Sequence, residues 1–157
     1  MNQPSMKGSY RLRALAAALL FVAGSSLPGA SGQLPGSVSV PPGELALGTI
    51  ELPRRVLANG QALSPGAYSV HLTSLTASPE ATGALAELER WVEFRQGDAV
   101  MGRELASIVP AAEIGDVAGA APPANGSARV EVLRGNDYVR VWINRDGTHY
   151  LIHLAAG

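Results

Sequence analysis

The chain contains no cysteine, a single lysine and few aromatic residues: two Trp, two Phe and four Tyr among 157 residues. Without cysteine there are no disulfide bonds, so a folded domain must be held together by its core. A chain of this length suits one globular domain with a modest core. The single lysine, Lys7, belongs to a distinct N-terminal region.

Residues 1–32 have the pattern of a secretory signal peptide. A basic leader precedes the short apolar run ALAAALLFVA, and the small residues GSSLPGASG follow it. The alternative is an uncleaved membrane anchor, but the apolar run is too short to span a bilayer. We therefore expect cleavage between Ser26 and Gln33, export to the periplasm or the extracellular space, and no membrane attachment afterwards. The basic residues of the leader are Lys7, Arg11 and Arg13.

Removal of this leader changes the charge balance. Three of the twelve basic residues are lost, so nine arginines face thirteen acidic residues and the net charge becomes −4. A mildly acidic surface argues against binding to nucleic acid, which needs basic groups for the phosphates. No glycine-rich phosphate loop or other cofactor motif occurs, so no cofactor is expected.

The mature chain divides into a linker and one β domain. Residues 33–43 are rich in Pro, Gly and Ser and predict an extended linker. Over residues 44–155 short apolar runs alternate with turn signals, and Asn59-Gly60 between two such runs predicts a hairpin. Residues 110–128 have little periodicity and predict a long flexible loop.

The segment from residue 89 to 105 predicts a hairpin of uncertain register. Val92 and Phe94 alternate with Trp91, Glu93 and Arg95, which favours a strand, although helix formers just before it leave a short helix possible. A three-residue loop would place Phe94 opposite Val100, and a two-residue loop would place it opposite Met101. Both registers remain open.

The C-terminal region predicts a three-stranded antiparallel meander. Two-residue turns at Gly135-Asn136 and Asp146-Gly147 bring apolar residues opposite one another on one face. That face must be covered by earlier strands, because its burial does not offset the entropy of ordering the meander. The fold class is therefore all-β, an antiparallel β-sandwich or a small barrel. The apolar face comprises Val130, Val132, Val139, Val141, Ile143, Tyr150, Ile152 and Leu154.

The reverse face of the meander is the candidate binding surface. Aromatic rings stack on sugars and arginine pairs with carboxylates, so such a face predicts a carbohydrate or protein ligand. The alternative is structural: Glu131, Arg140 and His153 form a cross-strand charge ladder, and another segment, such as the N-terminal arm, covers Trp142. The candidate ligand-binding residues are Arg129, Tyr138, Arg140, Trp142 and His153.

No catalytic or metal-binding residue is predicted. His149 and His153 share the spacing of zinc-protease histidines, but four residues of a strand span about 13–14 Å. The two rings therefore cannot bind one zinc ion at about 2.0–2.1 Å. His71 has no serine or acid at a recognisable spacing, so an enzymatic role is uncertain and less favoured than a non-catalytic one.

The segment LSPGAYSVHLT resembles the L-x-x-G-x-Y-x-V-x-L strand of small exported bacterial β-sandwich proteins without assigned function. The resemblance extends to ERWVEF, GRELA and VRVWINRDGTHYLIHL, and its motifs are turn glycines and core residues. It implies the fold and an exported location but no catalytic residue. We expect an exported, non-catalytic binding or interaction module of the bacterial cell envelope. A hydrolase-type enzyme or a structural subunit pairing by a sheet edge is the alternative.

Overall fold

The computed structural model describes residues 40–77 and 88–157, which form nine strands and one short helix. The predicted signal peptide and residues 33–39 of the predicted linker lie outside the described residues. No helix within the described ranges is long and apolar enough to span a bilayer. The elements are β1 (Leu45–Leu52), β2 (Val56–Ala58), β3 (Gln61–Leu63), β4 (Gly66–Thr76), β5 (Glu89–Gln96), β6 (Ala99–Pro110), α1 (Ile114–Ala118), β7 (Ala128–Val132), β8 (Tyr138–Arg145) and β9 (Thr148–Ala156).

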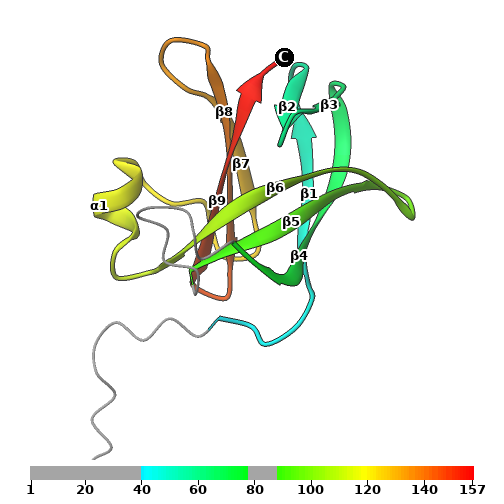
Figure 1. The fold of residues 1–157 in the computed structure, drawn as a ribbon. Coiled ribbons are helices and arrows are strands. Elements are labelled where there is room, and N and C mark those ends of the chain that lie inside the picture. Colours follow the sequence, from blue (N-terminus) through cyan, green and yellow to red (C-terminus); the bar gives the residue numbers. More distant parts are fainter. Residues whose placement is uncertain (1–39, 78–87) are drawn as a thin grey trace, which may run out of the picture. The chain divides into compact units, whose positions relative to one another are not determined.

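All nine strands belong to one antiparallel sheet. The neighbours run in the order β1, β4, β5, β6, β9, β8, β7, and the β2–β3 hairpin joins the end of β9. The two outer strands, β1 and β7, lie beside each other with no ladder between their described residues, so the sheet curls into a nearly closed barrel (Figure 1). The all-β, antiparallel prediction is confirmed, in the barrel form.

The C-terminal meander has the predicted register. Ile143 lies opposite Tyr150, and Val130 lies opposite Val141. Asp146 and Gly147 both have positive φ angles, 53° and 78°, which is the requirement of a type I′ turn. The first hairpin is built in the same way, with φ angles of 46° and 81° at Asn59-Gly60. Local turn chemistry therefore sets the register of both hairpins.

The inner face of the barrel is a continuous aliphatic and aromatic core. Six of the eight predicted meander positions are buried, and Val130 is partly buried against the core. The prediction is wrong for Val132, because this residue is 41% exposed. It is the last residue of β7, an edge strand paired on one side only, so nothing covers it. The six buried residues are Val139, Val141, Ile143, Tyr150, Ile152 and Leu154.

The β5–β6 hairpin has neither of the two predicted registers. Its turn is the two-residue kind, at Gly97-Asp98, but a bulge then places Phe94 opposite Gly102. The extra residue in β6 is Met101, which no sequence periodicity indicated. A Cβ atom on Gly102 would lie 3.1 Å from Leu63 Cδ2, so the β2–β3 hairpin rests directly on this part of β6.

The end of the predicted linker is part of the fold. Arg90 is only 3% exposed, and its guanidinium donates hydrogen bonds to the carbonyl oxygens of Pro41, Gly43 and Thr73; the Gly43 bond is 2.7 Å long. Burial lowers the pKa of Arg90 from its usual value. Val40 also packs against the core. Arg90 thus fastens the entering chain to β4 and β5.

Candidate functional site

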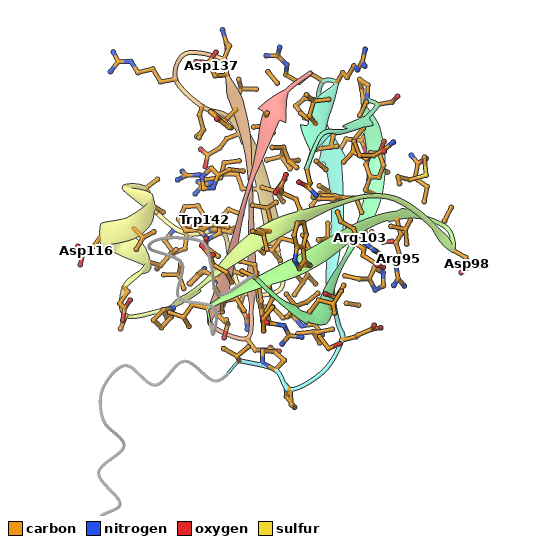
Figure 2. The ribbon with its side chains drawn as sticks, in the orientation of Figure 1. Arg95, Asp98, Arg103, Asp116, Asp137 and Trp142 are labelled. Atoms are coloured by element: carbon orange, nitrogen blue, oxygen red, sulfur yellow. The ribbon has the colours of Figure 1, made fainter. Side chains whose placement is uncertain are left out.

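The predicted binding face is covered at its centre. Trp142 is completely buried, and it packs with Val109, Ile114 and Leu151 in a second apolar cluster outside the barrel. Ile114 belongs to α1, which lies on this side of the sheet (Figure 2). Of the two alternatives left open by the sequence, the covered one holds for Trp142. The described cover is α1, which follows β6.

Polar contacts surround the Trp142 ring. Its Nε1–H donates a hydrogen bond to Nδ1 of His149 at 3.1 Å. The guanidinium carbons of Arg129 and Arg140 lie 4.9 and 5.3 Å from the ring centroid, within the range of cation–π attraction. Arg140 also forms an ion pair of 2.6 Å with Glu131, as the predicted ladder requires. The indole therefore has no free face to stack on a ligand.

The two arginines also hold the covering segment in place. Arg140 donates to the carbonyl oxygen of Ala118 at 3.2 Å, and Arg129 donates to that of Ala121. The structure thus brings together three of the five predicted ligand-binding residues: Arg129, Arg140 and Trp142. Their contacts join the covering segment to the meander.

The segment predicted as a flexible loop over residues 110–128 has a short helix and several anchors. The side chain of Asn144 donates to the carbonyl oxygen of Pro123 at 2.8 Å. The backbone N–H of Asp146 donates to Oδ1 of Asn125 at 2.7 Å, and that of Gly126 donates to the carbonyl oxygen of Asn144 at 2.8 Å. These bonds lay the segment along β8.

The remaining two predicted residues are exposed. Tyr138 is the first residue of β8 and is 49% exposed, four residues before Trp142. His153 is exposed on β9 opposite Arg140. They do not join Trp142 in a common surface, because α1 and the following chain lie over the ring. Ligand binding through these residues stays a prediction, and the surface they form has no exposed tryptophan ring at its centre.

A different surface, on β6 and the β2–β3 turn, is hollowed. A hollow of about 450 Å³ lies along β6 and the β2–β3 turn, and a second of about 220 Å³ adjoins it. The two share Asn59 and Arg103. We call this surface the β6-edge hollow and define it by Asn59, Leu75, Trp91, Val100, Met101 and Arg103.

Apolar side chains are unusually exposed in the β6-edge hollow. Among the described residues six large apolar side chains are exposed, and three of them, Leu75, Val100 and Met101, line it. Exposed apolar groups that gather beside polar ones mark interaction sites more often than scattered ones do. Trp91 adds a half-buried ring.

The strand edge beside the hollow is capped by a side chain. Residues 99–105 of β6 pair only with β5, since β9 begins to pair at Ala106. Glu104 accepts the backbone N–H of Leu105 at 3.0 Å and the backbone N–H of Asn59 at 2.6 Å. Its carboxylate therefore satisfies a donor of the free edge and ties the β2–β3 turn to β6.

Two arginines and two carboxylates lie beside the hollow. Glu93 is 6% exposed and lies between Arg95 and Arg103, at 2.5 and 2.7 Å. Hydrogen bonds from Arg95 and then from Arg103 hold the pKa of Glu93 below its ordinary value, against the opposing effect of burial. Two guanidiniums share one carboxylate, and the side chain of Arg103 is 54% exposed. Figure 2 shows both arginines on the β5–β6 arm, well away from Trp142.

His71 lies opposite Glu93, whose carboxylate is paired with Arg95 and Arg103. The hydroxyls on either side of it in β4 donate to the backbone of β5: Ser69 to the carbonyl of Arg95 and Thr73 to that of Trp91, at 3.3 and 2.9 Å. His71 does not line the β6-edge hollow. Within residues 40–77 and 88–157 no three potential metal ligands lie together. The hydrolase alternative thus stays untested.

The sequence predicts the β5 side of this surface but not the β6 side. The alternation in residues 89–95 places Trp91, Glu93 and Arg95 on the outer face of one strand, as the structure has them. The position of Arg103 beside them depends on the bulge at Met101, which the sequence does not reveal.

In comparisons with known proteins, no family model, no curated protein and no solved structure matches the chain.

Proposed function

We propose that the chain is an exported, non-catalytic binding module of the bacterial cell envelope, and that its ligand site is the β6-edge hollow. The N-terminal pattern of residues 1–32 supports the location. The observation that carries the proposed site is the meeting of two adjoining hollows at Asn59 and Arg103, with three exposed apolar side chains around them. A site with such groups binds through complementary contacts and needs no reactive residue.

The surface around Trp142 supports the proposal less well. Its indole is buried, and its arginines already donate to Glu131, Ala118 and Ala121. A ligand there would have to displace α1 before it met the ring. The β6-edge hollow is open in the described structure and keeps an exposed guanidinium at its centre.

Site-specific photocrosslinking in living cells tests both parts of the proposal. A photoreactive phenylalanine analogue replaces Met101, which is 38% exposed, or Val132, which is 41% exposed and lies on β7. The full chain, with residues 1–32, is expressed in a bacterium and irradiated, and cell fractions are separated. We expect adducts of raised mass in the envelope or extracellular fraction for position 101 and none for position 132.

Three outcomes would overturn the proposal. Retention of the irradiated chain in the cytoplasm would contradict export. Equal adducts at both positions, or none at position 101, would remove the β6-edge hollow as the site. An adduct at position 101 that consists of two copies of this chain would favour the structural subunit that pairs through a sheet edge.

A further inference from the structure

We infer that the β6-edge hollow binds an acidic oligosaccharide, whose sugar ring stacks on Trp91 and whose carboxylate pairs with Arg103. The inference rests on the proposed function and names its ligand class. It begins from the shape of the site: two hollows of about 220 and 450 Å³ adjoin at Asn59 and Arg103. A surface with two compartments in series suits a ligand of more than one unit.

Three side chains of the site, those of Trp91, Asn59 and Gln61, are of types that recognise sugars. Trp91 lines the smaller compartment and offers an aromatic face for the C–H groups of a sugar ring. Asn59 and Gln61 line the larger one and carry amide groups that donate to and accept from hydroxyls. Together they provide one aromatic ring and two neutral hydrogen-bonding groups beside the guanidinium of Arg103.

The exposed guanidinium of Arg103 favours an acidic ligand. Arg103 gives Nε and one Nη to Glu93, and its guanidinium retains N–H donors on the exposed side. Arg95 and Arg103 share the carboxylate of Glu93, and the carboxylate of Glu104 accepts from Asn59, so the attraction comes from the free donors of Arg103 and not from a net positive charge. A carboxylate is the natural partner for such donors, because guanidinium and carboxylate pair in bidentate geometry.

The free edge of β6 argues against a polypeptide strand as the ligand. Strand addition needs a row of free backbone donors and acceptors in regular register. Here Glu104 already accepts the N–H of Leu105, and the bulge at Met101 breaks the register of the edge. An added strand would have to expel a carboxylate that also holds Asn59. The groups that remain for recognition are side chains, and sugars are bound through side chains.

Isothermal titration calorimetry, which measures binding affinity, tests the inference with a matched pair of ligands. The full chain, after export and purification, is titrated with an oligogalacturonate of defined length and with the methyl ester of the same oligomer, which has no charge. We expect the acid to bind at least tenfold more tightly than the ester, and its affinity to fall as NaCl is added. Fluorescence should change as well, since Trp91 is one of only two tryptophans and the other is buried.

Three variants assign the contacts. Arg103→Ala should abolish the preference for the acid over the ester. Trp91→Ala should weaken both ligands about tenfold or more, because aromatic stacking does not depend on the carboxylate. Arg134→Ala, at an exposed arginine in the β7–β8 connection, should bind like the unaltered chain.

Equal affinity for acid and ester, or equal losses from Arg103→Ala and Arg134→Ala, would overturn the inference. A decamer of glutamate that binds more tightly than the oligogalacturonate would overturn it in favour of an acidic peptide. Failure here is separate from failure of the proposed function. Adducts at position 101 would still mark the β6-edge hollow as a binding site, with a ligand of another class.

Discussion

The indole N–H of Trp142 and the Nδ1 atom of His149 are joined by a buried hydrogen bond of 3.1 Å between β8 and β9. The imidazole accepts this bond only through a ring nitrogen without a proton, so the doubly protonated cation cannot make it. His149 is 2% exposed, and burial lowers its pKa below the usual value. The neutral ring is therefore a condition of the folded state.

The first prediction is a loss of stability on mild acidification. Because the pKa of His149 is lower in the folded chain, the unfolded chain takes up the proton first, so the free energy of unfolding falls as the pH drops below about 6.5. The slope is at most about 1.4 kcal/mol per pH unit for one proton. Urea unfolding at pH 7.5 and 5.5 measures it. His149→Gln should make this slope shallower without removing it, because burial, and then the charge of Arg140, lower the pKa of His153 as well.

The second prediction concerns the two tryptophans. Trp142→Ala should lower the free energy of unfolding by about 3–5 kcal/mol, since it removes a buried aromatic side chain and leaves a cavity. Trp91→Ala should cost much less, because this ring lies half-exposed on the outer face. Urea denaturation of both variants makes the comparison. A stable Trp142→Ala chain would mean that α1 does not cover the ring in solution.

The third prediction compares two valines of the meander. Val141→Asp should unfold the domain, because it places an unpaired charge on a side chain with no exposure. Val132→Asp should be tolerated, as that side chain is 41% exposed. Circular dichroism of the two purified variants distinguishes them. Two folded variants would show that the assigned inner face is wrong.

The fourth prediction tests the attachment of the entering chain. A chain that begins at residue 45 lacks the carbonyl groups of Pro41 and Gly43, which leaves the buried Arg90 with the carbonyl of Thr73. It should be less stable than a chain that begins at residue 40 by about 1–3 kcal/mol or more, the cost of an unsatisfied buried donor. Thermal unfolding of both chains measures the difference.

The control for this comparison is Arg90→Met. The substitution should lower stability in the longer chain and have little effect, or even raise stability, in the shorter one. An equal loss in both chains would show that Arg90 does not act through these two carbonyl groups.

The parts of the fold that the sequence predicts are those set by neighbouring residues. Asp146-Gly147 and Asn59-Gly60 adopt the positive φ angles that their turn type demands, and the register of each hairpin follows from its turn. The burial of Tyr68, Val70 and Leu72 follows from strict alternation in β4. Both signals act over a few residues and need no knowledge of the rest of the chain.

The candidate site depends on contacts that are distant in the sequence. The bulge at Met101 shifts β6 by one residue against β5 and so determines which side chains adjoin Glu93. The cover over Trp142 comes from a segment without apolar periodicity, which is held mainly by hydrogen bonds to backbone carbonyls. A pattern of alternating residues carries no signal for either, and the hollow beside Arg103 could not be anticipated.

Strand β9 is the only described strand that pairs with three others: β6, β8 and β2. All three precede it in the chain, so none of these ladders can form until residues 148–156 have left the ribosome. Until then β7 and β8 have no described hydrogen-bonded ladder to the rest of the sheet. Such dependence on a late strand delays closure of the barrel until synthesis of the chain is almost complete. Under the export that we propose, this delay would leave the barrel open while the chain is being made.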